Sequence, residues 1–453
     1  MKFFSALIAS SMLFLSPAFA EKSPPNLLVI MVDDLGYGDL SVYGAPDLKS
    51  PNIDALMNSG MRFDSFYANC PVCSPTRASF VTGLYPDMAG VPGVIRTPLP
   101  GKATSWGNLR NDVITLPSHL KTAGYETALI GKWHLGIEKP DRPTDVGFDF
   151  FHGFLGDMMD DYYNHLRHGK HYMRRNEVPV HPKGHATDIF TDWAVDYFEA
   201  REEAEDPFFM FLAYNAPHTP IQPPEDWLEK VKAREAGITD SRAALVALIE
   251  HLDAGVGRVV ASLKKEELWE DTVVVFTSDN GGQSSVGARN LPWHGGKQEM
   301  WEGGIRVGTS VTWPGVIEAG AVNKDHLSMT MDLYPTLAEI AGVPVKHELD
   351  GRSFLPVLKG EPFEESPRPV FWVRLEGNAK YGGIPYHAVR MGDWKLLRNT
   401  PFEPYQMFNL ATDSGEMKEV PRKVAPKRYA ELFNALMRHV NRAGQIPWQR
   451  ENP

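Results

Sequence analysis

The segment NLLVIMV at residues 26–32, which runs directly into DDLGYGD at residues 33–39, decides the fold class of this chain. A continuous apolar run of this length is typical of a strand that is buried on both faces of its sheet. Both faces of a parallel sheet are shielded from solvent when helices cover it on each side. The polar, glycine-rich segment that follows predicts a loop at the carboxyl end of that strand.

The same kind of apolar run recurs along the chain and alternates with helical patterns. Further strands are predicted at 61–67, 126–130, 207–214 and 272–277, and helices at 51–57, 116–122, 187–203 and 241–264. Helices that alternate with buried strands predict an α/β domain, with a large and mostly parallel central sheet flanked by helices. We assign residues 21–350 to this domain.

The pattern changes after about residue 351. Short alternating segments with turn residues between them lie at 370–374, 386–390, 394–398 and 406–409. This spacing predicts a smaller antiparallel sheet, and a helical pattern at 426–442 follows it. We therefore expect a C-terminal subdomain over residues 351–453, built from an antiparallel sheet and one helix.

The first twenty residues have the features of a cleavable secretory signal. Lys2 supplies the positive charge, residues 3–15 the apolar segment, and Ala18-Phe19-Ala20 the small residues of a cleavage site. The apolar segment is too short for a transmembrane helix, and no other segment is long enough to span a bilayer. We expect a protein that is cut near Ala20, is exported to the periplasm or the cell exterior, and has no membrane span.

The composition is that of an ordinary soluble globular protein. Of the 453 residues, 43% are hydrophobic and 23% are charged, which provides ample material for a core. The formal net charge of −11 argues against a nucleic-acid partner, because such proteins carry a basic surface. An anionic substrate would have to be bound by a local group of positive side chains.

Acidic and amide side chains follow two of the predicted buried strands. Asp33 and Asp34 come after the first strand, and Asp279 and Asn280 after the strand at 272–277. Ligands in parallel α/β sheets bind beyond the carboxyl ends of the strands. Hard oxygen donors without nearby thiolates suit Ca²⁺ or Mg²⁺ better than zinc. One such loop would be read as a turn, but two at one sheet edge predict a metal site.

Cationic side chains occupy loops of the same kind. Lys132 and His134 lie in GKWHLG, His218 lies in NAPHTP, and Lys297 lies in the glycine-rich segment HGGKQEMWEGGIRV. A single lysine or histidine on a loop is usually solvated surface. Together with Arg77, however, the four could bind a tetrahedral anion beside a cation.

The segment CPVCSPTR at residues 70–77 contains the only two cysteines of the chain. Pro75 marks the entry of a helix, so Cys73 lies at a helix N-terminus, where the backbone favours negative charge. Arg77, one turn further, can reach back over this end of the helix. Taken alone, the Cys70–Cys73 pair is equally compatible with a disulfide or a redox couple, while two cysteines are too few for a cysteine zinc site.

These motifs, taken in order, resemble those of the type I sulfatases of the alkaline-phosphatase-like superfamily. The matching segments are VDDLGYGD, CSPTRASFVTG, GKWHLG, APHTP, TSDNGG and GGKQEMWEGGIRV. They extend from Asp33 to Arg306, and the segments WKLL and QMFNLATD resemble the C-terminal subdomain of the family. Gly308 departs from the pattern, since proline is commoner there, and we expect little consequence.

The resemblance implies a modified residue and a metal ion. In the family, a maturation enzyme converts the motif cysteine, here Cys73, to formylglycine (3-oxoalanine), whose hydrate is the nucleophile. One Ca²⁺, with Mg²⁺ the weaker alternative, would be bound by Asp33, Asp34, Asp279 and Asn280, and an oxygen of residue 73 would complete its ligands.

The resemblance also implies a role for each basic residue. Arg77 would hold the nucleophile and the metal ligands in place, and Lys132 and Lys297 would pair with the sulfate oxygens. His134 would take the proton of the hydroxyl that does not attack, and His218 would protonate the leaving oxygen. Glu302, in the same loop as Lys297, is expected to orient that loop.

The region 156–183 has little apolar periodicity and is predicted to be a long loop, of the kind that often carries function. Aromatic and basic side chains there suit a sulfated sugar. The candidate substrate-binding residues are His165, Arg167, His168 and Arg174, joined by Tyr381, His387 and Arg390 from the C-terminal sheet. We expect hydrolysis of O-sulfate groups on a carbohydrate. Three alternatives stay open: a phosphonate or phosphate ester hydrolase, a non-catalytic glycan-binding protein with unmodified Cys73, and a redox protein.

Overall fold

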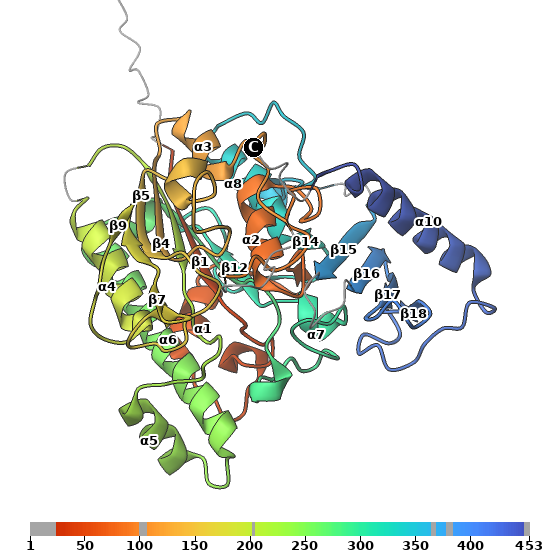
Figure 1. Ribbon diagram of the computed structural model, residues 1–453, viewed down its shortest axis with the longest axis horizontal. Coiled ribbons are helices and arrows are strands. Elements are labelled where there is room, and N and C mark those ends of the chain that lie inside the picture. Colours follow the sequence, from red (N-terminus) through yellow and green to blue (C-terminus); the bar gives the residue numbers. More distant parts are fainter. Residues whose placement is uncertain (1–23, 99–106, 202–203, 364–367, 377–383, 448–453) are drawn as a thin grey trace, which may run out of the picture.

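The computed structural model describes residues 24–98, 107–201, 204–363, 368–376 and 384–447 (Figure 1). The predicted signal at 1–20 and the candidate Tyr381 lie outside these residues. Within them, no helix combines the length and the apolar character that crossing a membrane requires.

The central sheet has ten strands in the order β13-β2-β12-β11-β1-β10-β4-β5-β8-β9. The bounds of its strands, in that order, are Ala321–Asn323, Met61–Phe63, Thr309–Thr312, Thr272–Ser278, Asn26–Val32, Phe208–Ala213, Glu126–Lys132, Phe150–Phe154, Met173–Arg175 and Val178–Pro179. Its five middle strands, β11 to β5, are all parallel, while β12 and β8 pair antiparallel with them. The structure thus confirms a large, mostly parallel sheet, and its antiparallel edge strands are too short to show a clear alternation in the sequence.

Helices cover both faces of this sheet, as the buried strands require. Neighbouring residues of a strand point to opposite faces of the sheet. On β10, Phe208 packs against Phe198 of α4 (Ala186–Glu199) on one face. Phe209 packs against Phe80 of α2 (Cys73–Thr82) on the other face. The remaining helices are α1 (Pro51–Asn58), α3 (Leu116–Lys121), α5 (Glu225–Arg234), α6 (Asp240–Lys265), α7 (Glu302–Ile305), α8 (Leu333–Ile340), α9 (Leu355–Leu358) and α10 (Pro426–Ala443).

The region 156–183, which was predicted to be a loop, forms two small hairpins instead. Strands β6 (Leu166–Arg167) and β7 (Lys170–His171) pair with each other, and β8 and β9 extend the central sheet. Strands of two or three residues are too short for apolar alternation to appear in the sequence. The predicted strand at 61–67 is likewise divided, into β2 and β3 (Phe66–Tyr67), and β3 pairs with β14 (Ser328–Met329).

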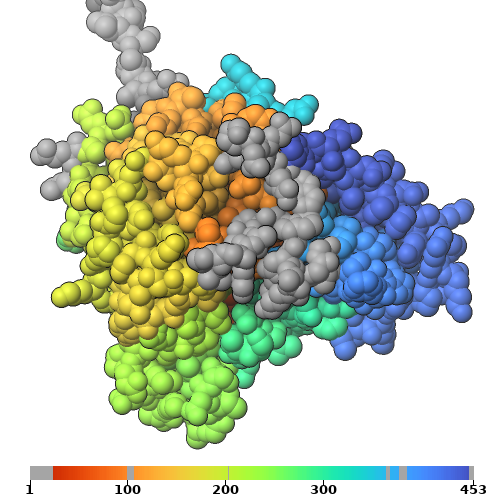
Figure 2. Space-filling model, viewed as in Figure 1, coloured from red at the N-terminus to blue at the C-terminus, as the bar shows by residue number. Residues whose placement is uncertain are grey.

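The C-terminal part confirms the predicted antiparallel sheet and helix. Strands β15 (Val370–Glu376), β16 (Ile384–Met391), β17 (Trp394–Arg398) and β18 (Gln406–Asn409) pair in chain order. One face packs on α10 through Leu396 and Leu436, and the other packs on the α/β domain through Trp372 and Leu397. Figure 2 shows this part, in blue, against the blue-green segment around residue 300.

Candidate active site

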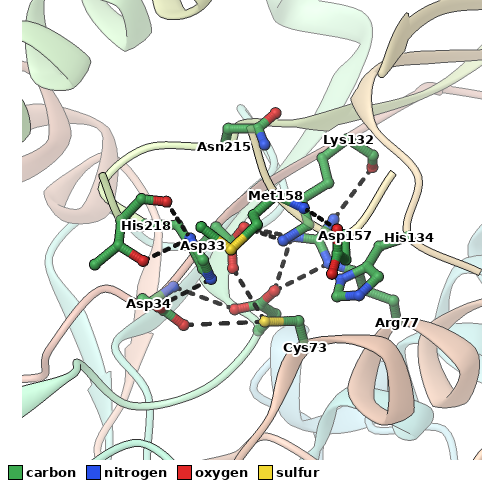
Figure 3. Close-up of polar contacts among 12 residues, drawn as sticks. Asp33, Asp34, Cys73, Arg77, Lys132, His134, Asp157, Met158, Asn215 and His218 are labelled. Atoms are coloured by element: carbon green, nitrogen blue, oxygen red, sulfur yellow. Dashed lines mark hydrogen bonds and ion pairs between the residues drawn. The ribbon is translucent and has the colours of Figure 1, made fainter. Parts of the chain in front are cut away.

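The carboxyl edge of the central sheet brings together the side chains that the sequence singled out (Figure 3). These are Asp33 and Asp34 after β1, Lys132 and His134 at the end of β4, His218 after β10, and Asp279 and Asn280 after β11. Since Val32 lies opposite Ser278 in the parallel register, the two acidic pairs leave the sheet side by side. Helix α2 begins at the same edge, with Cys73 as its first residue.

Buried ion pairs hold the carboxylates of this cluster. The Arg77 guanidinium, which has no exposed surface, donates from Nε and Nη2 to Asp279 Oδ2 at 2.9 and 2.8 Å. Lys132 donates to Asp33, and Lys297 Nζ lies 2.6 Å from Asp34 Oδ2. Each carboxylate therefore has its own cation, which offsets the cost of burying three negative charges.

The pKa values of two carboxyls reflect these pairings. Burial alone would raise the pKa of Asp33, but Lys132, with further help from His218 and Arg77, holds it well below its usual range. Burial and the neighbouring charge of Asp33 raise the pKa of Asp279 to about 7. A cation at this site would favour the ionised form of both carboxyls.

The donor set suits a hard metal ion such as Ca²⁺. Asp33, Asp34, Cys73 and His218 each offer a ligand atom, and these atoms lie within 4.8 Å of one another. Asn280 donates through Nδ2 to Asp34 Oδ1 at 2.7 Å. Its Oδ1 is buried and finds no hydrogen-bond partner in the described part of the chain. An unpartnered buried carbonyl among carboxylates is what an oxygen-binding cation would satisfy.

Cys73 faces this cluster, whereas Cys70 does not. The Cys73 sulfur lies 3.3 Å from Asp33 Oδ1 and 4.0 Å from Asp34 Oδ1, and the Cys70 sulfur lies 3.6 Å from the carbonyl of Val373. Both cysteines are free in this structure. Burial raises the pKa of both thiols, and in Cys73 the charge of Asp33 adds to it. The two sulfurs thus contact different groups, and this geometry does not favour a redox couple.

Two histidines flank residue 73, His134 on one side and His218 on the other in the view of Figure 3. His134 Nε2 lies 2.9 Å from the carbonyl of Ile95, while its buried Nδ1 has no partner among the described residues. Burial, with the charges of Lys132 and Arg77, holds the pKa of His134 well below its usual range. The ring is therefore neutral, with its proton on Nε2 and a free lone pair on Nδ1.

His218 has the complementary arrangement. Its Nδ1 lies 2.7 Å from the carbonyl of Thr219 and so carries a proton, which leaves Nε2 toward the cluster, 3.6 Å from Asp34 Oδ2. Burial and the charge of Lys297 lower the pKa of His218. A proton on Nε2 would therefore be given up readily to a substrate oxygen.

The candidate substrate-binding residues from the hairpin region are engaged in local contacts. Arg167 donates to Asp157 at 2.8 and 3.0 Å and to Asp160 at 3.0 Å. The other three also bind nearby groups: His165 Nε2 lies 3.0 Å from the Gly184 carbonyl, the His168 amide donates to Asp160, and Arg174 donates to the carbonyls of His171 and Met173. Arg167 contacts the site through Asp157, which lies beside Lys132 and His134 in Figure 3.

The two described candidates from the C-terminal sheet are engaged as well. His387, with 5% of its surface exposed, lies 3.0 Å from the Tyr405 hydroxyl. Arg390 donates to the Tyr67 hydroxyl and to the Gly392 carbonyl. Neither side chain has a hydrogen bond to the cluster around Cys73 among the contacts of the described residues.

Asp157, Met158 and Asn215 lie at the site and were not picked from the sequence (Figure 3). Asp157 is buried and accepts a hydrogen bond from Thr97 at 2.7 Å. It also lines a cavity of about 380 Å³ beside the cluster, together with Arg96, Thr97, His134 and Leu155. The rule that ligands gather at strand ends would have found Asp157, had β5 (FFHGF) been recognised. Asn215 follows β10 directly and would have been found by the same rule.

Comparisons with known proteins agree with this geometry. The family model described as Sulfatase matches residues 25–343, and that of the N-sulphoglucosamine sulphohydrolase C-terminal region matches residues 293–445. The N-acetylgalactosamine-6-sulfatase of Canis lupus familiaris is 32% identical over 400 residues, covering 83% of this chain and 72% of its own. A sulfatase of Formosa agariphila is 30% identical, covering 92% of this chain and 89% of its own.

A solved structure resembles the whole chain. The crystal structure of Ps i-CgsB in complex with k-i-k-neocarrahexaose superposes with a TM-score of 0.85 at 31% identity, covering 95% of this chain and 96% of that one. The family match spans more than half of the chain, and the motifs that it covers meet at one buried site. The chain therefore belongs to the sulfatase family of the alkaline phosphatase-like superfamily and is a sulfuric ester hydrolase.

Proposed function

We propose that this sulfatase removes O-sulfate groups from a carbohydrate, with formylglycine at residue 73 and one bound Ca²⁺. The observation that carries the proposal is the buried cluster itself. Cys73 lies 3.3 Å from Asp33, beside an unpartnered Asn280 carbonyl and within a ring of cations. Such a site suits a small dianion or ester anion bound against a metal ion.

Ca²⁺ at the Asp33, Asp34, Asp279 and Asn280 oxygens would neutralise charge on the sulfate group and lower the pKa of the attacking hydroxyl. The hydrated aldehyde at residue 73 would supply one hydroxyl that attacks sulfur and a second whose loss of a proton expels the sulfate. Conversion of Cys73 requires a maturation enzyme as a partner. Arg77 keeps Asp279 oriented through the two hydrogen bonds that it donates to the Asp279 carboxylate.

The basic side chains would then act on the substrate. Lys132 and Lys297, which pair with Asp33 and Asp34, would bind sulfate oxygens as charge shifts onto them. His134 Nδ1, with its free lone pair, would accept the proton of the hydroxyl that does not attack. His218 Nε2 would donate a proton to the leaving oxygen of the sugar.

A carbohydrate is favoured as the leaving group for two reasons. The cavity of about 380 Å³ beside His134 falls in the range of small-molecule sites and is lined by polar groups as well as Leu155. The relatives include enzymes named for N-acetylgalactosamine 6-sulfate and a protein crystallised with k-i-k-neocarrahexaose. The signal-like residues 1–20 support export, where an enzyme of this kind would meet sulfated polysaccharides.

The test first compares the turnover of sulfate, phosphate and phosphonate esters, and then the release of sulfate from different sugars. Nitrophenyl sulfate should be turned over faster than the matching phosphate and phosphonate esters, and Cys73→Ala should abolish turnover. Preference for a phosphorus ester would overturn the assignment of the reaction. A panel of defined sulfated oligosaccharides, with released sulfate as the readout, tests the carbohydrate, and release from aryl sulfates alone would contradict it.

A further inference from the structure

The loop that carries Lys297 lies between the catalytic domain and the C-terminal sheet. We call residues 293–306 the lysine loop. On the catalytic side, the Lys297 amide donates to the Gly282 carbonyl at 3.0 Å and the Gln298 amide donates to the Pro71 carbonyl at 2.9 Å. These two bonds place Lys297 next to the metal-binding strand ends and to the turn that precedes Cys73.

The C-terminal sheet holds the other side of the same loop. Arg374 of β15 donates to the Gln298 carbonyl at 2.8 Å, and Asn399, directly after β17, accepts from the Met300 amide at 2.5 Å. Helix α7 forms the end of the loop, and its Glu302 pairs with Lys395 of β17; Figure 1 shows α7 on the side of the molecule where the C-terminal sheet lies. The backbone of the lysine loop is therefore held on both sides, by main-chain groups of the α/β domain and by side chains of the C-terminal sheet.

A buried cluster of charged side chains joins the lysine loop to the C-terminal sheet at Glu302. Its Oε1 lies 2.9 Å from Lys395 Nζ, and its Oε2 accepts from the Tyr67 hydroxyl at 2.6 Å. Glu416 accepts from the Glu302 amide at 2.6 Å and lies 2.7 Å from Lys395 Nζ. The side chains of Glu302, Lys395 and Glu416 have no exposed surface. One lysine of the sheet thus bridges two carboxylates, of which one belongs to the lysine loop.

The pattern of β17 shows that Lys395 stands at a position meant for an apolar residue. Leu396 faces α10, while Leu397 and Lys395 face the catalytic domain, as alternation along a strand requires. Lys395 Nζ also lies 5.9 Å from the ring of Trp372. Apolar residues in place of all three charged side chains could pack there at no greater cost, because buried ion pairs seldom add net stability. A cation at this position is therefore better explained by orientation than by stability.

The lysine loop can transmit this constraint because it is folded tightly on itself. The Gly303 amide donates to the His294 carbonyl at 2.7 Å, and a Cβ on Gly304 would lie 2.1 Å from the Glu299 carbonyl. Because of these close contacts, the segment between Lys297 and Glu302 cannot easily change its backbone conformation to compensate for a displacement of Glu302. A movement of Glu302 would be passed to the Lys297 ammonium.

We propose that Lys395 and Glu416 are positioning residues for Lys297: through Glu302, the C-terminal sheet fixes the loop that brings the Lys297 ammonium to Asp34 and to the substrate's sulfate group. The role of Lys297 in this statement rests on the proposed function. Among the contacts of the described residues, the charge cluster has no hydrogen bond or ion pair to the metal-binding carboxylates, and none of its residues lines the cavity beside His134. They act only through the loop.

A double-mutant cycle tests the proposal on the full-length, converted enzyme. Lys395→Met should lower kcat/KM for nitrophenyl sulfate by about 10- to 100-fold, since a displacement of about 1 Å can cost that much. In the Lys297→Ala background the same change should cost less than about 2-fold, because the group it positions is gone. Equal losses in both backgrounds would show a merely structural role and overturn the proposal.

Control variants separate positioning from folding. His439→Gln breaks a buried pair of the same subdomain, between α10 and Asp87 at 3.0 Å, and no hydrogen bond or ion pair of these two side chains among the described residues reaches the lysine loop. It should lower Tm without changing kcat/KM, whereas Lys395→Arg should recover part of the activity lost in Lys395→Met. If Lys395→Met does not fold, the cycle is run with Lys395→Met/Glu416→Gln, which removes one charge of each sign.

Mass analysis of residue 73 accompanies every variant, so that incomplete conversion is not read as lost positioning. A fully converted wild-type enzyme without sulfatase activity would refute the proposed function. An active wild type with additive losses in the cycle would refute only the positioning role.

Discussion

Replacing Arg77 with lysine should destabilise the protein strongly, although the charge is retained. Arg77 makes three hydrogen bonds, two to Asp279 at 2.9 and 2.8 Å and one to the Lys132 carbonyl at 3.2 Å. An ammonium at this position can reach only one of these two partners. Because Arg77 and Asp279 are fully buried, water cannot replace the lost donors.

The expected loss follows from these contacts. Two hydrogen bonds with a charged partner are worth about 1.5–3 kcal/mol each, and breaking a buried pair costs about 3–5 kcal/mol. We therefore expect Arg77→Lys to lower the free energy of unfolding by about 3–5 kcal/mol. At about 2.1 cal/mol/K of unfolding entropy per residue, each kcal/mol lowers Tm by about 1 °C in a chain of this length, so Tm should fall by about 3–5 °C.

The assay is thermal unfolding of metal-free protein, followed by the same scan with Ca²⁺. A matched control is Arg258→Lys, since Arg258 pairs with Asp192 on the surface with half of each side chain exposed. That change should cost less than about 1 kcal/mol. Ca²⁺ should restore part of the Arg77→Lys loss, because it gives Asp279 another cation. A Tm for Arg77→Lys equal to that of the control would refute the reasoning.

Three further predictions concern the nucleophile, a histidine and the buried charge cluster. Peptide mass analysis of the active enzyme should show residue 73 lighter than cysteine, as the aldehyde; a Cys70–Cys73 disulfide in that preparation would contradict the mechanism. His134→Ala should lower kcat by about 10²- to 10⁴-fold with an unchanged Tm, as expected for a proton acceptor, and a loss below 10-fold would exclude that role. Burial raises the pKa of Glu416 to about 7, so its stabilising contribution is complete below about pH 4.5 and is lost as the pH rises through 7. Glu416→Gln should therefore gain stability relative to wild type between pH 6 and pH 8, and a difference in Tm that does not change with pH would argue against this titration.

The sequence was sufficient to predict the central part of the site because two simple rules coincide there. Asp33 and Asp279 follow long apolar strands, and parallel strands end at the same edge of their sheet. Lys132 and His218 follow from the same reasoning. The strands β4 and β10 are long and fully buried along most of their length, so their ends are visible in the sequence.

Other features depend on contacts that no pattern reveals. The basic side chain of Arg167 in a polar region predicts a substrate ligand, but its ion pairs with Asp157 and Asp160 do not follow from any pattern in the sequence. Asp157 was missed because β5 contains His152 and Gly153 and does not look apolar. Lys395 lies within WKLL, where spacing alone does not distinguish a buried lysine from an exposed one.

The burial of α2 implies that Cys73 has to be modified before the chain is fully folded. All ten residues from Cys73 to Thr82 are buried, and only 2% of the Cys73 surface is exposed. An enzyme that oxidises this side chain to an aldehyde must hold the segment in its own active site, which the closed fold does not permit. If residue 73 is converted as proposed, modification and folding would therefore compete in time, and a chain that folds first would keep its thiol. Slower folding should raise the yield of converted enzyme, and overproduction beyond the capacity of the converting enzyme should leave well-folded, inactive protein.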